Sequence, residues 1–283
     1  MIKKIGKERI TITMRKDLLD ALDQFIDGDT IRNRSHGIEY IVGRYLGAGI
    51  TTCVILAGGK EEQSLKTMLR IHSRPVIAYA IELLRQANIR NIILVINAAC
   101  QDIKRYLGNG SQWKVNISYV EEMEVCGTAH SLNLVRDKIT STFLLTYGDI
   151  LAEIDLQELV RFHREREGLI ATLAVTACTN PSLYGVTELQ GNRVYRLIEK
   201  PPSYDKTNLV FSGIAVCEPR LFEYLDDKCD RYLARDILPD LAHRGQIGGY
   251  PFSGKWFDVS HEEEYKRAQT EWIDPSEGVM PSS

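Results

Sequence analysis

The sequence predicts an α/β protein with a doubly wound, mostly parallel sheet, preceded by a small strand-helix-helix segment. From Thr51 onward, short apolar runs alternate with helical patterns of about ten residues, as in strands joined by crossover helices. Residues 9–47 instead contain one alternating run followed by two amphipathic helical patterns. With 283 residues, 44% of them hydrophobic, the chain can bury a sizeable core. We therefore expect domains at 1–47 and 50–273, followed by a disordered tail at 274–283.

The first segment begins with an alternating run from Arg9 to Arg15, which predicts a strand with one apolar and one polar face. A helix is expected at 17–26, and a second from its N-cap Ser35 to about residue 46, with Ile41 and Val42 among its inward positions. A single strand has no partner within its chain, and its apolar face has no cover. We therefore expect a homodimer, and pairing into tetramers is left open.

The second segment contains the pattern of a nucleotide-binding sheet. The expected strands lie at 53–56, 91–95, 115–120 and 143–146, and the expected helices at 75–86, 102–107 and 128–138. In such sheets, ligands bind beyond the carboxyl ends of the strands. Gly58-Gly59 and Gly148-Asp149 follow two of these ends, so we expect them to border a binding site. Glycine also lets the backbone approach a phosphate closely.

Charge and cysteine usage exclude some classes of protein. The net charge is −3, but six of the first sixteen residues are lysine or arginine, which favours an acidic partner for this end. The six cysteines are scattered without a C-x-x-C pair, so we expect reduced core residues rather than disulfides or zinc ligands. No apolar run is long enough to span a membrane, and no signal peptide is recognised. We expect a cytoplasmic protein without a membrane partner.

The strand-helix-helix pattern of residues 7–47 resembles the ribbon-helix-helix family of DNA-binding proteins. In that family, paired strands enter the major groove, and their outward side chains read base edges. The resemblance implies DNA as a partner. Arg9, Thr11 and Thr13 would read the base edges, and Arg15 would hold the DNA backbone. Arg34 and Ser35, at the start of the second helix, would bind a phosphate. The alternative is an arm that only dimerises.

The second segment resembles the sugar-phosphate nucleotidyltransferases, which include the mannose-1-phosphate guanylyltransferases and have a Rossmann-like sheet. The motifs that carry this resemblance occur in the family's order. They are Leu56-Ala57-Gly58-Gly59, Lys66 with Pro75, Gly127-Thr128-Ala129, Tyr147-Gly148-Asp149-Ile150, Tyr184-Gly185-Val186, Glu199-Lys200-Pro201 and Trp256-Phe257-Asp258. The resemblance implies attack of a sugar-1-phosphate on a nucleoside triphosphate, with Mg²⁺ as cofactor and pyrophosphate as leaving group.

The same resemblance implies a role for each motif residue. Lys66, Asp149 and Asp258 would be catalytic, and both aspartates would hold Mg²⁺, which prefers carboxylate oxygens. The implied nucleotide-binding residues are Leu56, Ala57, Gly58, Gly59, Glu122, Gly127 and Thr128. The implied sugar-binding residues are Gly185, Glu199, Lys200 and Gly213.

Glu122 bears on the choice of base. Related thymidylyl and uridylyl enzymes usually have glutamine at this place, and guanylyltransferases often have glutamate. A carboxylate can accept two hydrogen bonds from the adjacent ring N–H and amino donors of guanine. We therefore expect a guanine nucleotide; the alternative is that Glu122 belongs to a solvated acidic loop with Glu121 and Glu124.

One departure from the family decides the functional prediction. The segment between Gly59 and Lys66 is about ten residues shorter than in the family and lacks the arginine that grips the departing phosphates. The sequence therefore predicts a transcription regulator whose nucleotidyltransferase-like domain binds a nucleotide sugar such as GDP-mannose, with weak or no catalysis. The alternative is an active sugar-1-phosphate nucleotidyltransferase that makes the nucleotide sugar and pyrophosphate.

Overall fold

The computed structural model describes residues 10–26, 31–45, 49–59, 66–97 and 100–273. The chain divides into two compact units, Met1–Gly49 and Ile50–Ser283. Among the described residues, no helix is both long and apolar enough to cross a membrane. The tail expected at 274–283 lies outside the described residues.

The described residues of the first unit form two helices, α1 (Lys16–Gln24) and α2 (Arg34–Tyr45). Leu22 of α1 is buried against Gly37 of α2, where a Cβ atom would lie 2.8 Å from the leucine Cδ1. A glycine at this point therefore lets the two helices approach closely. The side-chain oxygen of Asn33 accepts a hydrogen bond from the backbone N–H of His36 at 2.9 Å.

The predicted strand at 9–15 is absent from the part of this segment that the structure describes. Residues 10–15 form neither helix nor strand, and Arg9 lies outside the described residues. The backbone groups of a lone strand have nothing to pair with in a single chain, which is the physical reason for this difference. Ile41 and Val42, expected to face inward, are 37% and 44% exposed.

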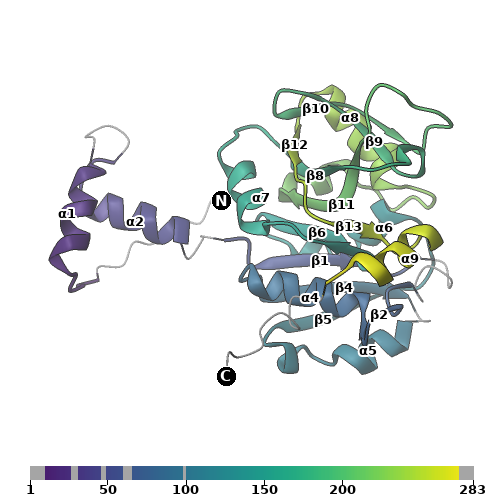
Figure 1. Cartoon of the computed structure of the whole chain (residues 1–283), viewed down its shortest axis with the longest axis horizontal. Coiled ribbons are helices and arrows are strands. Elements are labelled where there is room, and N and C mark those ends of the chain that lie inside the picture. The colour runs from purple at the N-terminus through teal and green to yellow at the C-terminus, as the bar shows by residue number, and fades with distance from the viewer. Residues whose placement is uncertain (1–9, 27–30, 46–48, 60–65, 98–99, 274–283) are drawn as a thin grey trace. The chain divides into compact units, whose positions relative to one another are not determined.

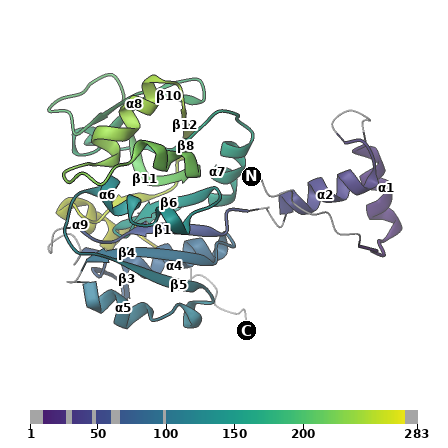
Figure 2. The same ribbon diagram turned by 180° about the vertical axis from the view of Figure 1, so that it is seen from behind.

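The second unit is built on one nine-stranded sheet in the order β5-β4-β1-β6-β11-β8-β12-β10-β9. Its strands are β1 (Thr52–Leu56), β4 (Asn91–Asn97), β5 (Asn116–Glu122), β6 (Phe143–Tyr147), β8 (Ala171–Ala177), β9 (Gly185–Gln190), β10 (Arg193–Glu199), β11 (Leu209–Cys217) and β12 (Ile247–Pro251). Figures 1 and 2 show this sheet from opposite sides, with β5 and β10 far apart.

The sheet is parallel over one half and mixed over the other. Strands β5, β4, β1 and β6 are parallel, as predicted. Strand β11 runs antiparallel to both β6 and β8, and its pairing with β8 shifts register between Phe211 and Ala215. Strand β12 is parallel to β8, whereas β10 is antiparallel to both β12 and β9. A mostly parallel sheet is therefore correct for the first half only.

Helices cover both faces of the sheet, as in a doubly wound fold. Their bounds are α4 (Val76–Gln86), α5 (Gln101–Leu107), α6 (Thr128–Asn133), α7 (Leu156–Arg164), α8 (Leu238–His243) and α9 (Glu262–Glu271), with a π-helical turn η6 (Leu233–Ile237). Alternation along β1 sends Ile55 into one core, which contains residues of α4, α5 and α7. Val54 and Leu56 face the other core, with residues of α6, η6 and α8.

Short antiparallel ladders complete the second unit. Strand β7 (Ile150–Ala152) pairs with β13 (Trp256–Asp258), and β2 (Arg70–Ile71) pairs with β3 (Arg74–Pro75). The β7–β13 ladder brings two segments together that are about a hundred residues apart in the chain.

The cysteines differ from the expectation that all six are reduced. Cys126 and Cys229 form a disulfide across 103 residues of sequence. The other four, Cys53, Cys100, Cys178 and Cys217, carry free thiols, and all but Cys178 are buried, as expected. Spacing alone could not reveal this pair, because the fold and not the sequence brings the two segments together.

Candidate active site

The glycine turn after β1 lies at the carboxyl ends of β1, β4 and β5. The backbone N–H of Ala57 donates to Val95 O at 2.9 Å, and the amide of Asn97 donates to the carbonyl of Gly59. A Cβ atom on Gly58 would lie 3.2 Å from Oε2 of Glu122 and 3.6 Å from the backbone N of Asn97. The turn therefore lies directly beside the Glu122 carboxylate, and the missing side chain leaves room there.

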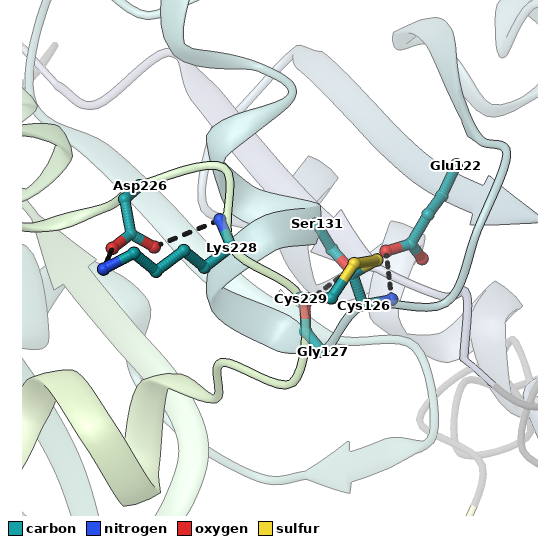
Figure 3. Close-up of a disulfide and its surroundings, with 7 residues drawn as sticks. All are labelled: Glu122, Cys126, Gly127, Ser131, Asp226, Lys228 and Cys229. Carbon is teal, nitrogen blue, oxygen red and sulfur yellow. Dashed lines mark hydrogen bonds and ion pairs between the residues drawn. A yellow bond between two sulfur atoms is a disulfide. The ribbon is translucent and has the colours of Figure 1, made fainter.

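Glu122 is buried, with 2% of its surface exposed, whereas Glu121 and Glu124 are exposed. Its Oε1 accepts hydrogen bonds from the Ser131 hydroxyl at 2.8 Å and from the Cys126 N–H at 3.5 Å (Figure 3). Its Oε2 has no hydrogen-bond partner among the described residues. A buried carboxylate oxygen without a donor is costly, so it is suited to receive one from a ligand.

Asp149 and Asp258 are brought together by the β7–β13 ladder. Asp258 pairs with Ile150, and the backbone N–H of Val259 donates to the carbonyl of Asp149 at 3.0 Å. Oδ1 of Asp258 accepts from Ser260 N at 2.9 Å. Both aspartates are half-buried.

The charges around Asp149 alter its ionisation. Burial raises the pKa of Asp149 to about 7, the negative charge of Asp258 adds to this, and Lys66 opposes it. The Lys66 ammonium donates to the carbonyl of Ser260 at 2.5 Å. Two neighbouring carboxylates that resist joint ionisation form a donor set that fits a hard divalent cation such as Mg²⁺.

The predicted sugar residues meet where β9 pairs with β10. Gly185 lies opposite Glu199, and a Cβ atom on Gly185 would come 3.0 Å from the Glu199 Oε2. Burial raises the pKa of Glu199, while the positive charges of Lys200 and Arg235 lower it. Lys200 has a φ of 44°, rare for a residue other than glycine, and its N–H donates to Tyr184 O at 2.9 Å.

Tyr147 is a site residue that the sequence reasoning named only as part of a motif. Burial raises its pKa, the Glu199 charge adds to this, and a hydrogen bond with Thr128 lowers it. Gly213, with φ of 83°, packs on the tyrosine ring, where a Cβ atom would lie 2.7 Å from Cδ2. Tyr147 therefore lies between Thr128, which the sequence predicts to bind a nucleotide, and Glu199 and Gly213, which it predicts to bind a sugar. Its place immediately before Gly148-Asp149 at a strand end was the available signal.

Gly127 and Thr128, where helix α6 begins, lie against a segment that follows about a hundred residues later in the sequence. A Cβ atom on Gly127 would lie 2.4 Å from the carbonyl oxygen of Arg231, and its φ is 96°. The Ala129 N–H donates to the same carbonyl at 3.0 Å, and the Thr128 hydroxyl accepts from Leu233 N at 2.9 Å. The start of α6 is therefore held by residues 231–233.

The predicted DNA-binding residues all belong to the first unit. Arg9 lies outside the described residues, and the other five, Thr11, Thr13, Arg15, Arg34 and Ser35, are exposed. Arg34 forms two hydrogen bonds of 2.6 Å with the carboxylate of Asp23. Arg15 pairs with Asp17 at 3.1 Å. Part of the positive charge expected to face DNA is thus already balanced within the chain.

Comparison with known proteins bears on the second unit. The family profile described as Nucleotidyl transferase matches residues 52–274. A protein of Sulfolobus acidocaldarius is 29% identical over 234 residues, covering 79% of this chain and 64% of its own. The Danio rerio protein named mannose-1-phosphate guanylyltransferase catalytic subunit beta is 26% identical over 208 residues, covering 71% of this chain and 56% of its own. The chain thus spans less than two thirds of these relatives.

Solved structures agree on the fold. The structure titled UDP-glucose pyrophosphorylase complexed with UDP-glucose superposes with a TM-score of 0.67 at 22% identity, covering 78% of this chain and 97% of that one. The comparisons cover the sheet and the candidate site but give no support to a ribbon-helix-helix domain at residues 1–47. From residue 52 to residue 274, the chain belongs to the nucleotidyl transferase family.

Proposed function

We propose that the second unit transfers a nucleotidyl group from a guanine nucleoside triphosphate to a sugar-1-phosphate and releases pyrophosphate. The observation that carries this proposal is the convergence of Lys66, Asp149 and Asp258 beside the glycine turn that faces Glu122. The sequence favoured a DNA-binding regulator with weak or no catalysis, with an active nucleotidyltransferase as the alternative. We now place the active nucleotidyltransferase first.

The nucleotide end of the site supports recognition of guanine. Glu122 holds Oε1 in hydrogen bonds with Ser131 and Cys126 and leaves Oε2 free beside Gly58. Guanine offers two adjacent donors to such a carboxylate. In a buried site, a polar group left without a partner costs free energy, so each of these hydrogen bonds would favour guanine. The Gly58-Gly59 backbone approaches the phosphates without a side chain in the way.

The reacting phosphates would lie near Asp149, Asp258 and Lys66. Asp149 and Asp258 would hold Mg²⁺, which supplies positive charge to phosphoryl oxygens during an in-line displacement. Lys66 adds a positive charge to the same place and offsets the charge of the two carboxylates. These residues position and neutralise; the attacking oxygen comes from the sugar phosphate itself.

The sugar-1-phosphate would bind at the other end of the site. Lys200 neutralises its phosphate, and the Glu199 carboxylate accepts hydrogen bonds from sugar hydroxyls. Gly185 keeps the backbone beside Glu199 open, since a side chain there would meet the carboxylate. The Tyr147 hydroxyl, which is hydrogen-bonded to Thr128, lies close enough to Glu199 for the two groups to influence each other's charge.

The missing arginine predicts a slow enzyme rather than an inactive one. The short segment of residues 60–65 that contains no arginine lies outside the described residues. Loss of one guanidinium at the leaving pyrophosphate costs a transition-state contact, an effect of about 10²–10³-fold on rate. The metal-binding and sugar-binding residues are unaffected by that loss.

The test is pyrophosphate release from pairs of nucleoside triphosphate and sugar-1-phosphate. We expect release with GTP and mannose-1-phosphate, and a loss of at least about 10²-fold in Asp149→Asn. Asp102→Asn, an exposed aspartate that pairs with Arg105, serves as the matched control and should retain full activity. Equal activity of Asp149→Asn and the wild type would refute the assigned role, and no release with any pair would refute catalysis.

A second candidate function concerns the first unit. Ile10, Leu18 and Phe25 are 73%, 50% and 60% exposed, an unusual set for a unit whose described residues form two helices. A second copy would cover these side chains and pair the alternating segments into a DNA-reading ribbon, with the nucleotide sugar as a regulator. DNA binding that does not change with any nucleotide sugar would eliminate this regulatory function.

A further inference from the structure

The disulfide between Cys126 and Cys229 joins the segment between β5 and α6 to the segment that precedes η6 (Figure 3). The first segment begins at Glu122, whose buried carboxylate lies beside Gly58. The second, residues 229–233, packs under Gly127. We call residues 126–129 and 229–233, with the disulfide that joins them, the clasp.

Backbone hydrogen bonds connect the clasp to Glu122. The Arg231 N–H donates to the carbonyl of Cys126 at 3.2 Å, and the Ala129 N–H donates to Arg231 O at 3.0 Å. The Cys126 N–H donates to the Glu122 Oε1 at 3.5 Å. The position of Cys126 thus determines one of the two donors that orient the Glu122 carboxylate. Opening the disulfide leaves this donor held only by the backbone hydrogen bonds of the clasp.

The two cysteines differ in exposure. Cys126 is buried, with 5% of its surface exposed, whereas Cys229 is an exposed residue. We therefore expect a thiolate from outside to attack the disulfide at Cys229, with Cys126 as the leaving group. Exchange that begins at Cys229 would break the disulfide that holds Cys126 at the nucleotide end of the proposed site.

We propose that Cys126–Cys229 is a thiol–disulfide exchange site that sets the affinity of the Glu122 pocket for a nucleotide base. This rests on the proposed function, because it assumes that Glu122 receives the base. In the disulfide form the clasp holds the Cys126 N–H against Glu122. In the dithiol form the segment 123–127 is released and must be ordered again when the ligand binds.

The exchange uses a dithiol reductant. One thiolate of the reductant attacks the Cys229 sulfur, the Cys126–Cys229 bond breaks, and Cys126 leaves as a thiolate that takes up a proton. The second thiol of the reductant then displaces Cys229 and closes its own disulfide. Two electrons and two protons pass to the protein, and the reductant is oxidised to a disulfide.

Glu124 controls the rate of this exchange. A carboxylate oxygen of Glu124 and the two sulfur atoms all lie within 4.8 Å of one another. Negative charge spreads over the sulfurs as the thiolate attacks, and the neighbouring carboxylate opposes it. Glu124→Gln should therefore be reduced about 2–5 times faster than the wild type.

The test compares oxidised and dithiothreitol-reduced protein for binding of GTP with Mg²⁺ by calorimetry, with thiols counted by mass spectrometry. Reduction should weaken binding about tenfold, because ordering the released segment opposes binding. Cys126→Ser with Cys229→Ser should bind as weakly as the reduced protein, with or without dithiothreitol. Cys178→Ser, which removes a half-exposed free thiol, should respond to reduction like the wild type.

Some outcomes would overturn the proposal. An unchanged dissociation constant on reduction would do so, as would six free thiols after treatment with an oxidant. Should neither form bind GTP, the proposed function fails, and hydrogen exchange of residues 122–133 then decides on the clasp. Faster exchange in the reduced protein supports the clasp, and identical exchange in both forms rejects it.

Discussion

Asp149 is held in a place that disfavours its charge. Its pKa is raised from 3.8 to about 7 by burial and by Asp258. The folded state therefore binds more protons than the unfolded state between about pH 4 and pH 7, and stability falls as pH rises through this window. Below pH 4 the group is protonated in both states and costs nothing.

Removing this charge should stabilise the metal-free protein. We expect Asp149→Asn to raise the free energy of unfolding at pH 8 by about 1–2 kcal/mol, less than the full shift because solvent screens the half-exposed pair of aspartates. At pH 4 the variant and the wild type should unfold alike in urea. Asp102→Asn should change neither value, and a destabilised Asp149→Asn at pH 8 would contradict the argument.

Glu122 is expected to select the base. In Glu122→Gln an amide donor replaces one acceptor, so it faces the donors of guanine and matches the carbonyl and N–H of uracil or thymine. We predict a loss of about 10²-fold or more in kcat/KM with GTP and a shift of preference towards UTP or dTTP. The exposed neighbour Glu121, which pairs with Lys104, gives the control Glu121→Gln. Equal loss with all triphosphates would argue for a structural role of Glu122.

Sequence motifs could suggest the candidate groups but not their contacts. Lys66, Asp149 and Asp258 could be chosen because each stands in a motif whose chemistry is specific. Two features depend on burial and on neighbours from distant segments. They are the unpaired Oε2 of Glu122 and the position of Tyr147 among Thr128, Glu199 and Gly213. No local pattern carries that information, since Glu121, Glu122 and Glu124 look alike in sequence.

Helix α6 depends on close contact with the 231–233 segment. In Gly127→Ala the new Cβ would meet the Arg231 carbonyl at 2.4 Å, and the φ of 96° would be strained. We predict a destabilisation of about 2–3 kcal/mol and weaker nucleotide binding, measured by urea unfolding and calorimetry. Gly108 also has a positive φ, of 58° with a ψ of −139°, but open space around it, so Gly108→Ala should carry the backbone strain alone and cost less than Gly127→Ala. Equal costs would show that strain, and not the contact, matters at Gly127.

Elements with strong local patterns were predictable, and their arrangement was predictable only in part. Strands β1, β4, β5 and β6 form continuous apolar or alternating runs, and helices separate them, which favours parallel pairing. The direction of β11 between β6 and β8 depends on contacts between segments far apart in sequence. The strand expected at residues 9–15 needs a partner that a single chain does not supply.

Across the whole molecule, the disulfide closes a loop of 103 residues. Its reduction should lower the free energy of unfolding by about 2–4 kcal/mol, because the unfolded chain regains freedom. For a domain of this size the expected fall in Tm is roughly 4–16 °C. Calorimetry with and without dithiothreitol measures it, and Cys126→Ser with Cys229→Ser should be insensitive to the reductant. A reductant effect of the same size in this double variant would place the cause elsewhere.

Assembly should depend on the apolar face of the first unit. We predict that Ile10→Asp with Ile12→Asp lowers the oligomeric state seen by light scattering, because charge would replace the apolar face of the ribbon that two copies would form. The opposite face provides a matched pair, since Thr11→Ala with Thr13→Ala should preserve assembly but weaken DNA binding. Wild-type protein that is monomeric at every concentration would exclude the paired ribbon.

Strand β11 is hydrogen-bonded to β6 on one side and to β8 on the other. A rotation of one half of the second unit against the other would have to break the hydrogen bonds of these ladders. Hinge motion between the halves would therefore cost much free energy. The register shift around Gly213, beside Tyr147, is the one irregularity in this strand, and it allows only local bending. Turnover should therefore be limited by loop movement around a rigid frame, and substrate entry should leave the sheet unchanged.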